Sequence, residues 1–274
     1  MSRFSMAAVL ILSMAGGARA QDAGAASPIT IGETFTIDSK ALGEARRINV
    51  YRAPSWDEPE GAPRPVLYMP DGGIAEDFLH VAGLLQVSTG NGTMRPFLLV
   101  GIENTERRRD MTGPTANDED KKIAPRVGGS AAFRAFIRDE LMPAVKARYR
   151  TTGETAIVGE SLAGLFVVET LLVEPSLFDT YIAFDPSMWW NNGKLVEQAA
   201  AALHSPAMSG RRLFLASSAD GDRGDAVKQL VAALASQPAG GLRWTHQRMP
   251  DETHATIYHP AALIAFRALF KPGR

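Results

Sequence analysis

Short, continuous runs of apolar residues alternate along this chain with longer segments of helical periodicity, and this alternation limits the possible folds most strongly. The runs occupy residues 66–69, 97–100, 156–158, 181–184 and 213–216. Continuous apolar runs are typical of strands that are buried on both faces. Strands that alternate with helices usually form a largely parallel sheet with helices on both of its faces. The sequence therefore predicts an α/β fold with a mostly parallel central sheet.

Other segments complete this prediction. Residues 30–37 and 47–51 alternate in polarity, as expected of edge strands, and apolar residues recur at helical spacing from 133 to 149. Pro143 lies inside that pattern and is expected to kink or interrupt the helix. Further helices are predicted at 162–173, 224–236 and 258–270. The irregular segment 105–129 is too long for a plain connection, and such loops are usually functional or disordered.

Composition excludes several classes of protein. The chain has 274 residues, of which 45% are hydrophobic and 22% charged, in the range of ordinary globular proteins. A formal net charge of −1 gives no sign of nucleic acid or an anionic membrane as a partner. The absence of cysteine rules out disulfides, thiolate zinc sites and thiol nucleophiles. No spacing of His, Asp and Glu is typical of a metal site, so we expect neither a metal nor a cofactor.

The N-terminal segment differs from the rest of the chain. Arg3 precedes an apolar stretch at 6–14, and Ala18 and Ala20 form a small-x-small cleavage signal. We expect residues 1–20 to be a secretory signal peptide that is cleaved after Ala20, a retained N-terminal anchor being the alternative. Residues 21–28 are then a flexible leader and residues 29–274 a single domain. The mature protein should be periplasmic or secreted, with no integral membrane segment.

The strongest chemical signal is the sequence Gly159-Glu160-Ser161-Leu162-Ala163-Gly164, a variant of the nucleophile elbow. A predicted strand precedes it and a predicted helix follows it, as that motif requires. Small residues beside the serine allow a sharp turn that exposes Oγ, and the helix start offers free N–H groups to developing negative charge. Ser161 is therefore the candidate nucleophile, the alternative being an ordinary helix N-cap.

A serine nucleophile needs a general base, and the chain has five histidines. His254 alone is expected in a loop at the carboxyl end of a strand downstream of Ser161. Of the others, His80 precedes the nucleophile and His204 precedes a later strand. His246 is predicted within a strand and His259 within the last helix. His254 is therefore the candidate base, with an exposed loop histidine as the alternative.

Stabilisation of an oxyanion requires backbone N–H groups close to the nucleophile. Gly72 and Gly73 follow the buried run 66–69, and glycine lets the backbone approach a substrate oxygen closely. We assign the N–H groups of Gly73 and Leu162 to this oxyanion hole. A simple turn after a strand would explain the glycine pair equally well.

These residues, together with several short motifs in the same order, resemble the bacterial putative-esterase family of the α/β-hydrolase superfamily. That family includes siderophore trilactone esterases and esterase-D-like enzymes. The matching motifs are distributed over nearly the whole mature chain and are LYMPDG (67–72), VGIENT (100–105), RRRDMT (107–112), FIRDELMP (136–143), GES (159–161), DPSMWW (185–190) and His254. One departure is Asp185, because the family usually has serine there. The resemblance implies an α/β-hydrolase fold and ester hydrolysis.

The resemblance also implies that certain side chains face the substrate. These are Asn104, Arg107, Arg109, Trp189 and Trp190. Arginine binds carboxylate, phenolate or carbonyl oxygen through a planar fork, and tryptophan offers a flat apolar wall. A solvated run of charges and packing in the core are the respective alternatives.

The acid that orients His254 is the least defined member of the site. In this fold the acid follows the second strand after the nucleophile strand, which directs attention to the segment after 213–216. Asp220 comes first after that strand, and we favour it over Asp222, while an acid from elsewhere in the chain stays open.

Together these features predict a serine hydrolase that cleaves carboxylic esters through an acyl-enzyme. Its substrate would be a small-molecule ester, either a siderophore trilactone or a simple acyl ester. An acyltransferase with the same triad and a non-catalytic ligand-binding protein on a hydrolase scaffold are the alternatives. Nothing in the sequence indicates an oligomeric state.

Overall fold

The computed structural model describes residues 26–55, 59, 61–221, 225–237 and 240–273. The expected signal peptide and most of the expected leader therefore lie outside the described residues, as does Asp222. Residues 26–32 have no regular secondary structure. One compact unit spans Gly32–Arg274, and the domain start at residue 29 stays a prediction.

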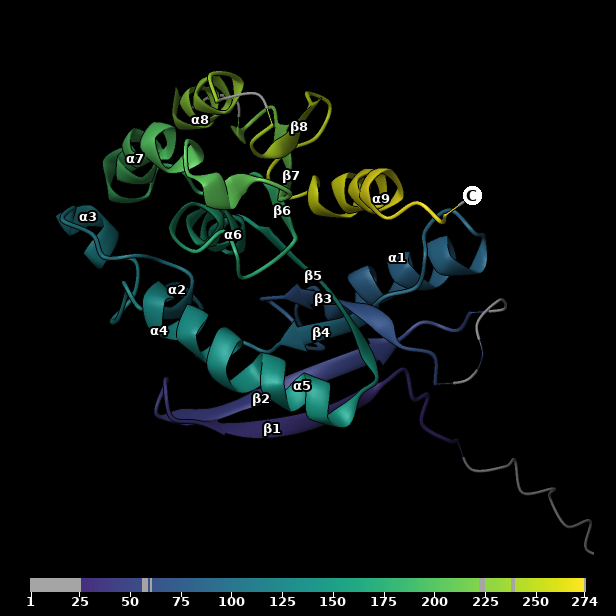
Figure 1. Cartoon of the computed structure of the whole chain (residues 1–274). Helices are drawn as coiled ribbons and strands as arrows, with labels where there is room; N and C mark the ends of the chain where they lie inside the picture. Colours follow the sequence, from purple (N-terminus) through teal and green to yellow (C-terminus); the bar gives the residue numbers. More distant parts are fainter. Residues whose placement is uncertain (1–25, 56–58, 60, 222–224, 238–239, 274) are drawn as a thin grey trace, which may run out of the picture. The chain divides into compact units, whose positions relative to one another are not determined.

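A single eight-stranded sheet organises the part of the chain that the structure describes (Figure 1). Its order is β1-β2-β4-β3-β5-β6-β7-β8. The strands β1 and β2 pair antiparallel with each other, β2 pairs antiparallel with β4, and all other pairs are parallel. The strand bounds are β1 Glu33–Ser39, β2 Glu44–Arg52, β3 Arg64–Met69, β4 Leu98–Ile102, β5 Thr151–Glu160, β6 Thr180–Phe184, β7 Arg212–Ser218 and β8 Arg243–Met249. The predicted mostly parallel sheet is confirmed.

Helices cover both faces of this sheet, and each face has its own apolar core. On one face α1 (Phe78–Gly90) and α9 (Tyr258–Leu269) pack against residues such as Val158 and Ile182. The other face packs residues such as Ile157 and Tyr181 against the remaining longer helices, α4 (Ser130–Phe136), α5 (Met142–Arg148), α6 (Leu162–Val173), α7 (Lys194–Leu203) and α8 (Asp225–Ala235). The alternation of side chains along each central strand thus fills two cores, which explains why these strands are continuously apolar.

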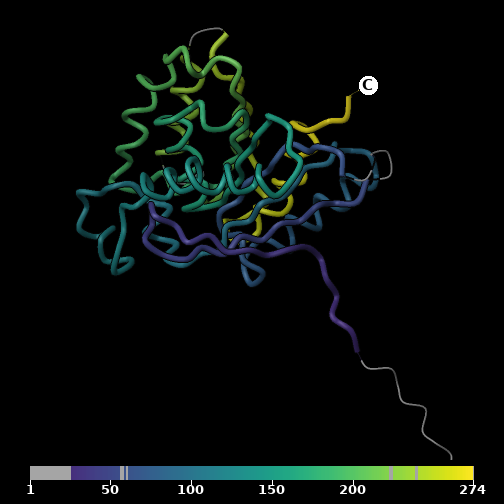
Figure 2. The backbone as a smooth tube through the Cα atoms, turned by 60° about the horizontal axis from the view of Figure 1, so that its bottom comes forward, coloured from purple at the N-terminus to yellow at the C-terminus, as the bar shows by residue number. Residues whose placement is uncertain are grey.

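The backbone trace shows how the chain crosses the sheet (Figure 2). The purple hairpin β1–β2 occupies one edge of the sheet, and the green to yellow C-terminal strands lead to the other edge. Short helical segments lie in the connections: α2 (Arg107–Asp110), α3 (Asp118–Lys121), η2 (Trp190–Gly193) and η3 (Pro206–Met208). The long segment 105–129 is therefore ordered around two of them.

The predicted helix at 133–149 is interrupted, as expected. It consists of α4, a π-helical turn η1 (Ile137–Leu141) and α5. Pro143 lies at the start of α5, and because proline lacks an N–H and clashes with the carbonyl four residues earlier, the preceding turn widens. The helix predicted at 162–173 is confirmed without a shift, whereas α1 and α7 were not predicted.

Candidate active site

Ser161 lies in a sharp turn between β5 and α6. Its φ of 60° and ψ of −119° are unusual for a residue other than glycine. Close packing of this turn requires the flanking glycines, because a Cβ on Gly159 would lie 2.7 Å from Ala163 and one on Gly164 would lie 3.0 Å from the Phe184 carbonyl oxygen. The geometry is that of a nucleophile elbow, with Oγ raised above the carboxyl end of the sheet.

The loop between β8 and α9 places His254 beside Ser161. Its Nε2 lies 3.0 Å from Ser161 Oγ, and its side chain is 47% exposed. Other histidines have different surroundings: His246 on β8 contacts Ser217 Oγ at 2.8 Å, while His80 of α1 and His259 of α9 lie with their ring centroids 5.5 Å apart and their planes tilted by 49°. The structure thus brings together the predicted nucleophile and the predicted base.

The carboxylate that contacts the ring of His254 is that of Asp185 and not that of Asp220, which the sequence favoured. Asp185 Oδ2 lies 3.3 Å from the ring Nδ1. Asp220 Oδ2 instead accepts a hydrogen bond of 3.0 Å from the backbone N–H of His254. Asp185 directly follows β6, which neighbours β5 in the sheet, whereas Asp220 follows β7, one strand farther away. In the sequence, the signal for this acid is that Asp185 directly follows the apolar run 181–184.

Hydrogen bonds fix the carboxylate of Asp185. Ser218 donates its backbone N–H to Oδ1 at 2.7 Å and its hydroxyl to Oδ2, and the side chain of Asp185 is 1% exposed. Burial alone would raise the pKa of Asp185, but the bonds from His254 and Ser218 hold that pKa below its ordinary value. Gly221 packs so closely that a Cβ there would lie 2.2 Å from Asp185 Oδ1.

The pKa of His254 is raised above the ordinary value of imidazole. The hydrogen bond to Asp185 is the largest cause, followed among the raising influences by the nearby charges of Glu160, Asp185 and Asp220. A carboxylate on Nδ1 fixes the ring so that Nε2 faces Ser161, and it stabilises the imidazolium form. The ring is therefore oriented as a general base requires, and the imidazolium that forms when it takes a proton is stabilised.

Glu160 is a second carboxylate at the imidazole, and sequence reasoning assigned it no role. Its Oε1 lies 3.2 Å from His254 Nε2, and its side chain is 16% exposed. Burial raises the pKa of Glu160 to about 7, against the lowering influence of His254 and Arg107.

The two predicted oxyanion donors differ in their surroundings. Leu162 is the first residue of α6, so its N–H has no partner within the helix. Gly73 follows β3, which pairs with β5, but its N–H donates to Glu76 Oε2 at 2.7 Å. The other oxygen of Glu76 accepts from the backbone N–H of Asn104 at 3.3 Å. The Gly73 amide must leave Glu76 before it can bind an oxyanion.

Arg107 and Asn104 both bind the same buried carboxylate. Arg107 forms a fork on Asp71, with Nε 2.7 Å from Oδ1 and Nη2 2.9 Å from Oδ2. Asn104 Nδ2 also donates to Asp71 Oδ1, at 2.5 Å. The three residues border a shallow, open depression together with Glu76 and Asp77. The charge of Arg107 is thus matched within the protein.

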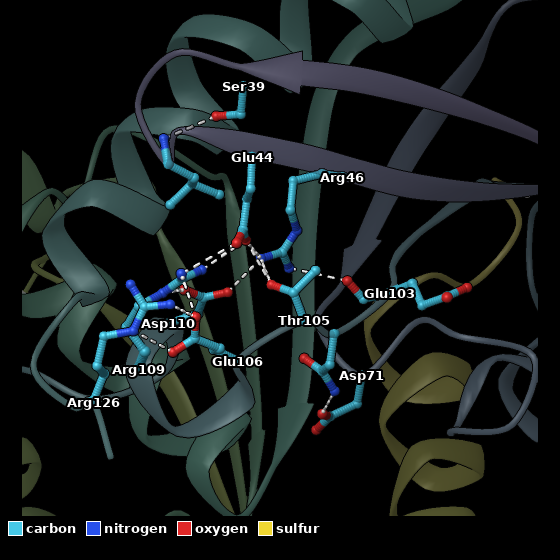
Figure 3. Close-up of polar contacts among 12 residues, drawn as sticks. Ser39, Glu44, Arg46, Asp71, Glu103, Thr105, Glu106, Arg109, Asp110 and Arg126 are labelled. Carbon is cyan, nitrogen blue, oxygen red and sulfur yellow. Dashed lines mark hydrogen bonds and ion pairs between the residues drawn. The ribbon is translucent and has the colours of Figure 1, made fainter. Parts of the chain in front are cut away.

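Arg109 lies in a network of ion pairs (Figure 3). It contacts Glu44 of β2 at 2.7 Å, Glu106 at 3.1 Å and Asp110 at 2.6 Å. Arg46, which is fully buried, contacts both Glu44 and Asp110 from β2. These bonds anchor the segment after β4 to the hairpin β1–β2. The side chain of Arg109 therefore holds this loop in place, whereas the resemblance implied that it faces the substrate.

A cavity of about 340 Å³ opens beside Ser161 and His254. Its lining combines the polar groups of Asp185, Ser187 and Asp220 with the apolar side chains of Pro186, Met188, Trp189, Ala226 and Val227. Trp189 is 54% exposed and forms part of this wall. Trp190 is buried, and its Nε1 donates to the Gly113 carbonyl at 2.8 Å, so it packs in the core and does not line the cavity. Asn104, Arg107 and Arg109 are also outside this lining.

Two further properties concern only the residues that the structure describes. No cluster of three or more His, Cys, Asp or Glu side chains among them could hold a metal ion. None of the described helices is long and apolar enough to cross a membrane.

Comparison with known sequences shows that the chain is similar to esterases. The family described as Putative esterase matches residues 39–247. Ferri-bacillibactin esterase BesA of Bacillus subtilis is 32% identical over 185 residues, which are 61% of this chain and 63% of that protein. The siderophore triacetylfusarinine C esterase of Aspergillus fumigatus is 30% identical over 195 residues, 66% of this chain and 64% of that protein. The aligned region thus spans just under two thirds of the length of each relative.

A solved structure has a similar fold. The crystal structure of an IroE-like serine hydrolase from Shewanella oneidensis superposes with a TM-score of 0.75 at 26% sequence identity. The superposition covers 88% of this chain and 80% of that one.

Proposed function

Because the chain belongs to the Putative esterase family, we propose that it is a serine hydrolase that cleaves carboxylic esters. The observation that carries this proposal is the position of His254, whose Nε2 lies 3.0 Å from Ser161 Oγ while its Nδ1 lies 3.3 Å from Asp185. A nucleophile, a base and an acid in contact in this order form the working part of an acyl-transfer site.

The reaction follows from these contacts. Ser161 Oγ attacks the ester carbonyl carbon as its proton moves to His254 Nε2, and Asp185 stabilises the resulting imidazolium. The N–H groups of Leu162 and Gly73 bind the oxyanion, the latter after release from Glu76. Collapse of the tetrahedral intermediate expels the alcohol, which takes the proton from Nε2. A water molecule, deprotonated by the same nitrogen, then releases the acid and restores Ser161.

Labelling with a fluorophosphonate tests this mechanism directly. The probe should modify Ser161 in the wild-type protein, as peptide mapping can show, and should leave the Ser161→Ala variant unlabelled. The neighbouring hydroxyl of Ser187, 3.4 Å from Ser161 Oγ, provides a matched control: Ser187→Ala should still be labelled. An unlabelled wild-type protein that is folded would contradict the proposed function.

The substrate follows from the cavity and from the named activities of the relatives. Met188, Trp189 and Val227 give the cavity an apolar wall suited to a planar or aliphatic group of a small ester. The curated relatives are named as esterases of siderophores, which makes a siderophore ester, such as a trilactone, one candidate, with simple acyl esters as the other. Comparison of kcat/KM for p-nitrophenyl esters of graded length with that for a ferric trilactone distinguishes these classes.

We also propose that the protein is exported. The N-terminal sequence motif supports a periplasmic or secreted location after cleavage at Ala20. Intact mass measurement of the exported protein should give a chain that begins at Gln21. A mass that includes Met1 in the exported fraction would contradict cleavage.

A further inference from the structure

Glu160 contacts the reactive nitrogen of His254 from the residue directly before the nucleophile. Its Oε1 lies 3.2 Å from Nε2, the same atom that lies 3.0 Å from Ser161 Oγ. Among the described residues this oxygen is buried and accepts no hydrogen bond of good geometry. Buried carboxylate oxygens are normally hydrogen-bonded, so the position of Glu160 calls for an explanation in terms of charge.

The surroundings of Glu160 come from several elements. The groups that interact with its charge are Arg107 of α2, Asp71 after β3, Asp185 after β6, His254 before α9 and Tyr258 at the start of α9. The two cations lower the pKa of Glu160 and the two aspartates raise it, in addition to the larger effect of burial. Since Arg107 is already bound to Asp71, the imidazole is the cation that Glu160 contacts most directly.

The two chemical states of Nε2 respond oppositely to a carboxylate at this distance. In neutral His254 the lone pair on Nε2 accepts the hydroxyl of Ser161, and a negative charge beside it is unfavourable. Once the proton has moved from Ser161 Oγ to Nε2, the same charge attracts the imidazolium. Glu160 keeps its own protonation state in this step, because the proton passes only between oxygen and nitrogen.

We propose that Glu160 is a positioning residue of the active site, whose carboxylate strengthens the hold of His254 on its proton from the side that faces Ser161. This inference rests on the proposed function. Glu160 therefore favours the imidazolium of the tetrahedral intermediate, and while it is ionised it also raises the pH below which the resting imidazole is protonated and inactive.

The test is the pH dependence of kcat/KM for p-nitrophenyl acetate in Glu160→Gln, which keeps the shape of the side chain and removes its charge. The acid limb should move to lower pH by about one unit, because an opposite charge at contact distance shifts an imidazole by about that much or more. Above that limb kcat should fall roughly tenfold, since the imidazolium intermediate loses stabilisation. Glu160→Asp, which retains a carboxylate, should keep the acid limb close to its wild-type position.

A matched control removes the same charge elsewhere. Glu197→Gln, on an exposed side chain of α7 that pairs with Lys194, should leave the acid limb unchanged. An acid limb that stays in place in a folded Glu160→Gln variant would overturn the inference. Fluorophosphonate labelling of Ser161 in the wild-type protein separates this result from failure of the proposed function.

A second measurement does not depend on the Gln variant. In the Ser161→Ala protein, the ring ¹⁵N signals of His254 should follow pH in two steps, because coupled groups titrate as a pair. Both steps belong to the coupled pair of His254 and Glu160, and the pKa of Glu160 is raised to about 7. A single step over the whole pH range would also overturn the inference.

Discussion

Replacement of Asp185 by asparagine should disable the site while leaving the fold intact. Asparagine has the shape of aspartate, and its oxygen can still accept the backbone N–H of Ser218, which lies 2.7 Å from Oδ1. What disappears is the negative charge, 3.3 Å from His254 Nδ1. The amide N–H₂ group can also face the ring and favour the wrong tautomer, with the proton on Nε2.

The size of the effect follows from this distance. A carboxylate and an imidazolium 3.3 Å apart attract each other by about 5 kcal/mol at an effective dielectric constant of about 20. Solvent screens part of this, since the ring is 47% exposed. With about 1.4 kcal/mol for each factor of ten in rate, kcat should fall about 1,000-fold.

The comparison variant is Asp220→Asn, because this carboxylate binds the backbone N–H of His254 and not its ring. We expect that kcat falls at most about tenfold, because the asparagine oxygen can still accept this hydrogen bond and only the contribution of the charge is lost. The assay is hydrolysis of p-nitrophenyl acetate, with circular dichroism and thermal melting to confirm folding. Equal losses in the two variants, or a larger loss in Asp220→Asn, would refute the assignment of Asp185.

Three further predictions follow from contacts at the site. Gly221→Ala should lower kcat about 10- to 100-fold and the free energy of unfolding by about 1–3 kcal/mol in melting experiments, because its Cβ would lie 2.2 Å from Asp185 Oδ1. Unchanged kinetics would show that the loop can move away from Asp185 at no cost to activity. Trp189→Ala should raise KM about 3- to 10-fold for aromatic esters with little change in kcat, as an exposed apolar wall is lost, and an effect on kcat alone would contradict this role. Glu76→Ala should raise kcat/KM severalfold by freeing the Gly73 N–H, whereas a large loss would mean that Glu76 holds that loop in its active shape.

Much of the fold could be predicted because the central strands are buried on both faces. Their continuous apolar runs are visible in the sequence without knowledge of their neighbours, and the same holds for α6, which is buried along most of its length. By contrast α1 and α7 were not predicted. Glycine and β-branched residues weaken the helical signal of α1, and α7 begins after the left-handed residue Gly193.

Within the site, the sequence identified the residues whose roles depend on local geometry. Ser161 needs only the turn between a strand and a helix, and His254 needs only a loop after a strand. The acid depends on which strands are neighbours in the sheet, and counting strands along the chain led to Asp220 instead of Asp185. In the same way, a run of arginines does not reveal that Glu44, more than sixty residues before Arg109 in the chain, compensates its charge.

The contact between Asp185 and Ser218 limits which side chains this corner of the sheet can hold. The parallel strands β6 and β7 pair Phe184 with Ala216, so that the residues just beyond them share one corner of the sheet. The side chains of Asp185 and Ser218 are both buried, so a carboxylate at position 218 would lie against that of Asp185 with little solvent between them, and each negative charge would disfavour the other. This corner therefore has room for one ionised carboxylate, and position 218 is restricted to a small side chain that donates a hydrogen bond to it.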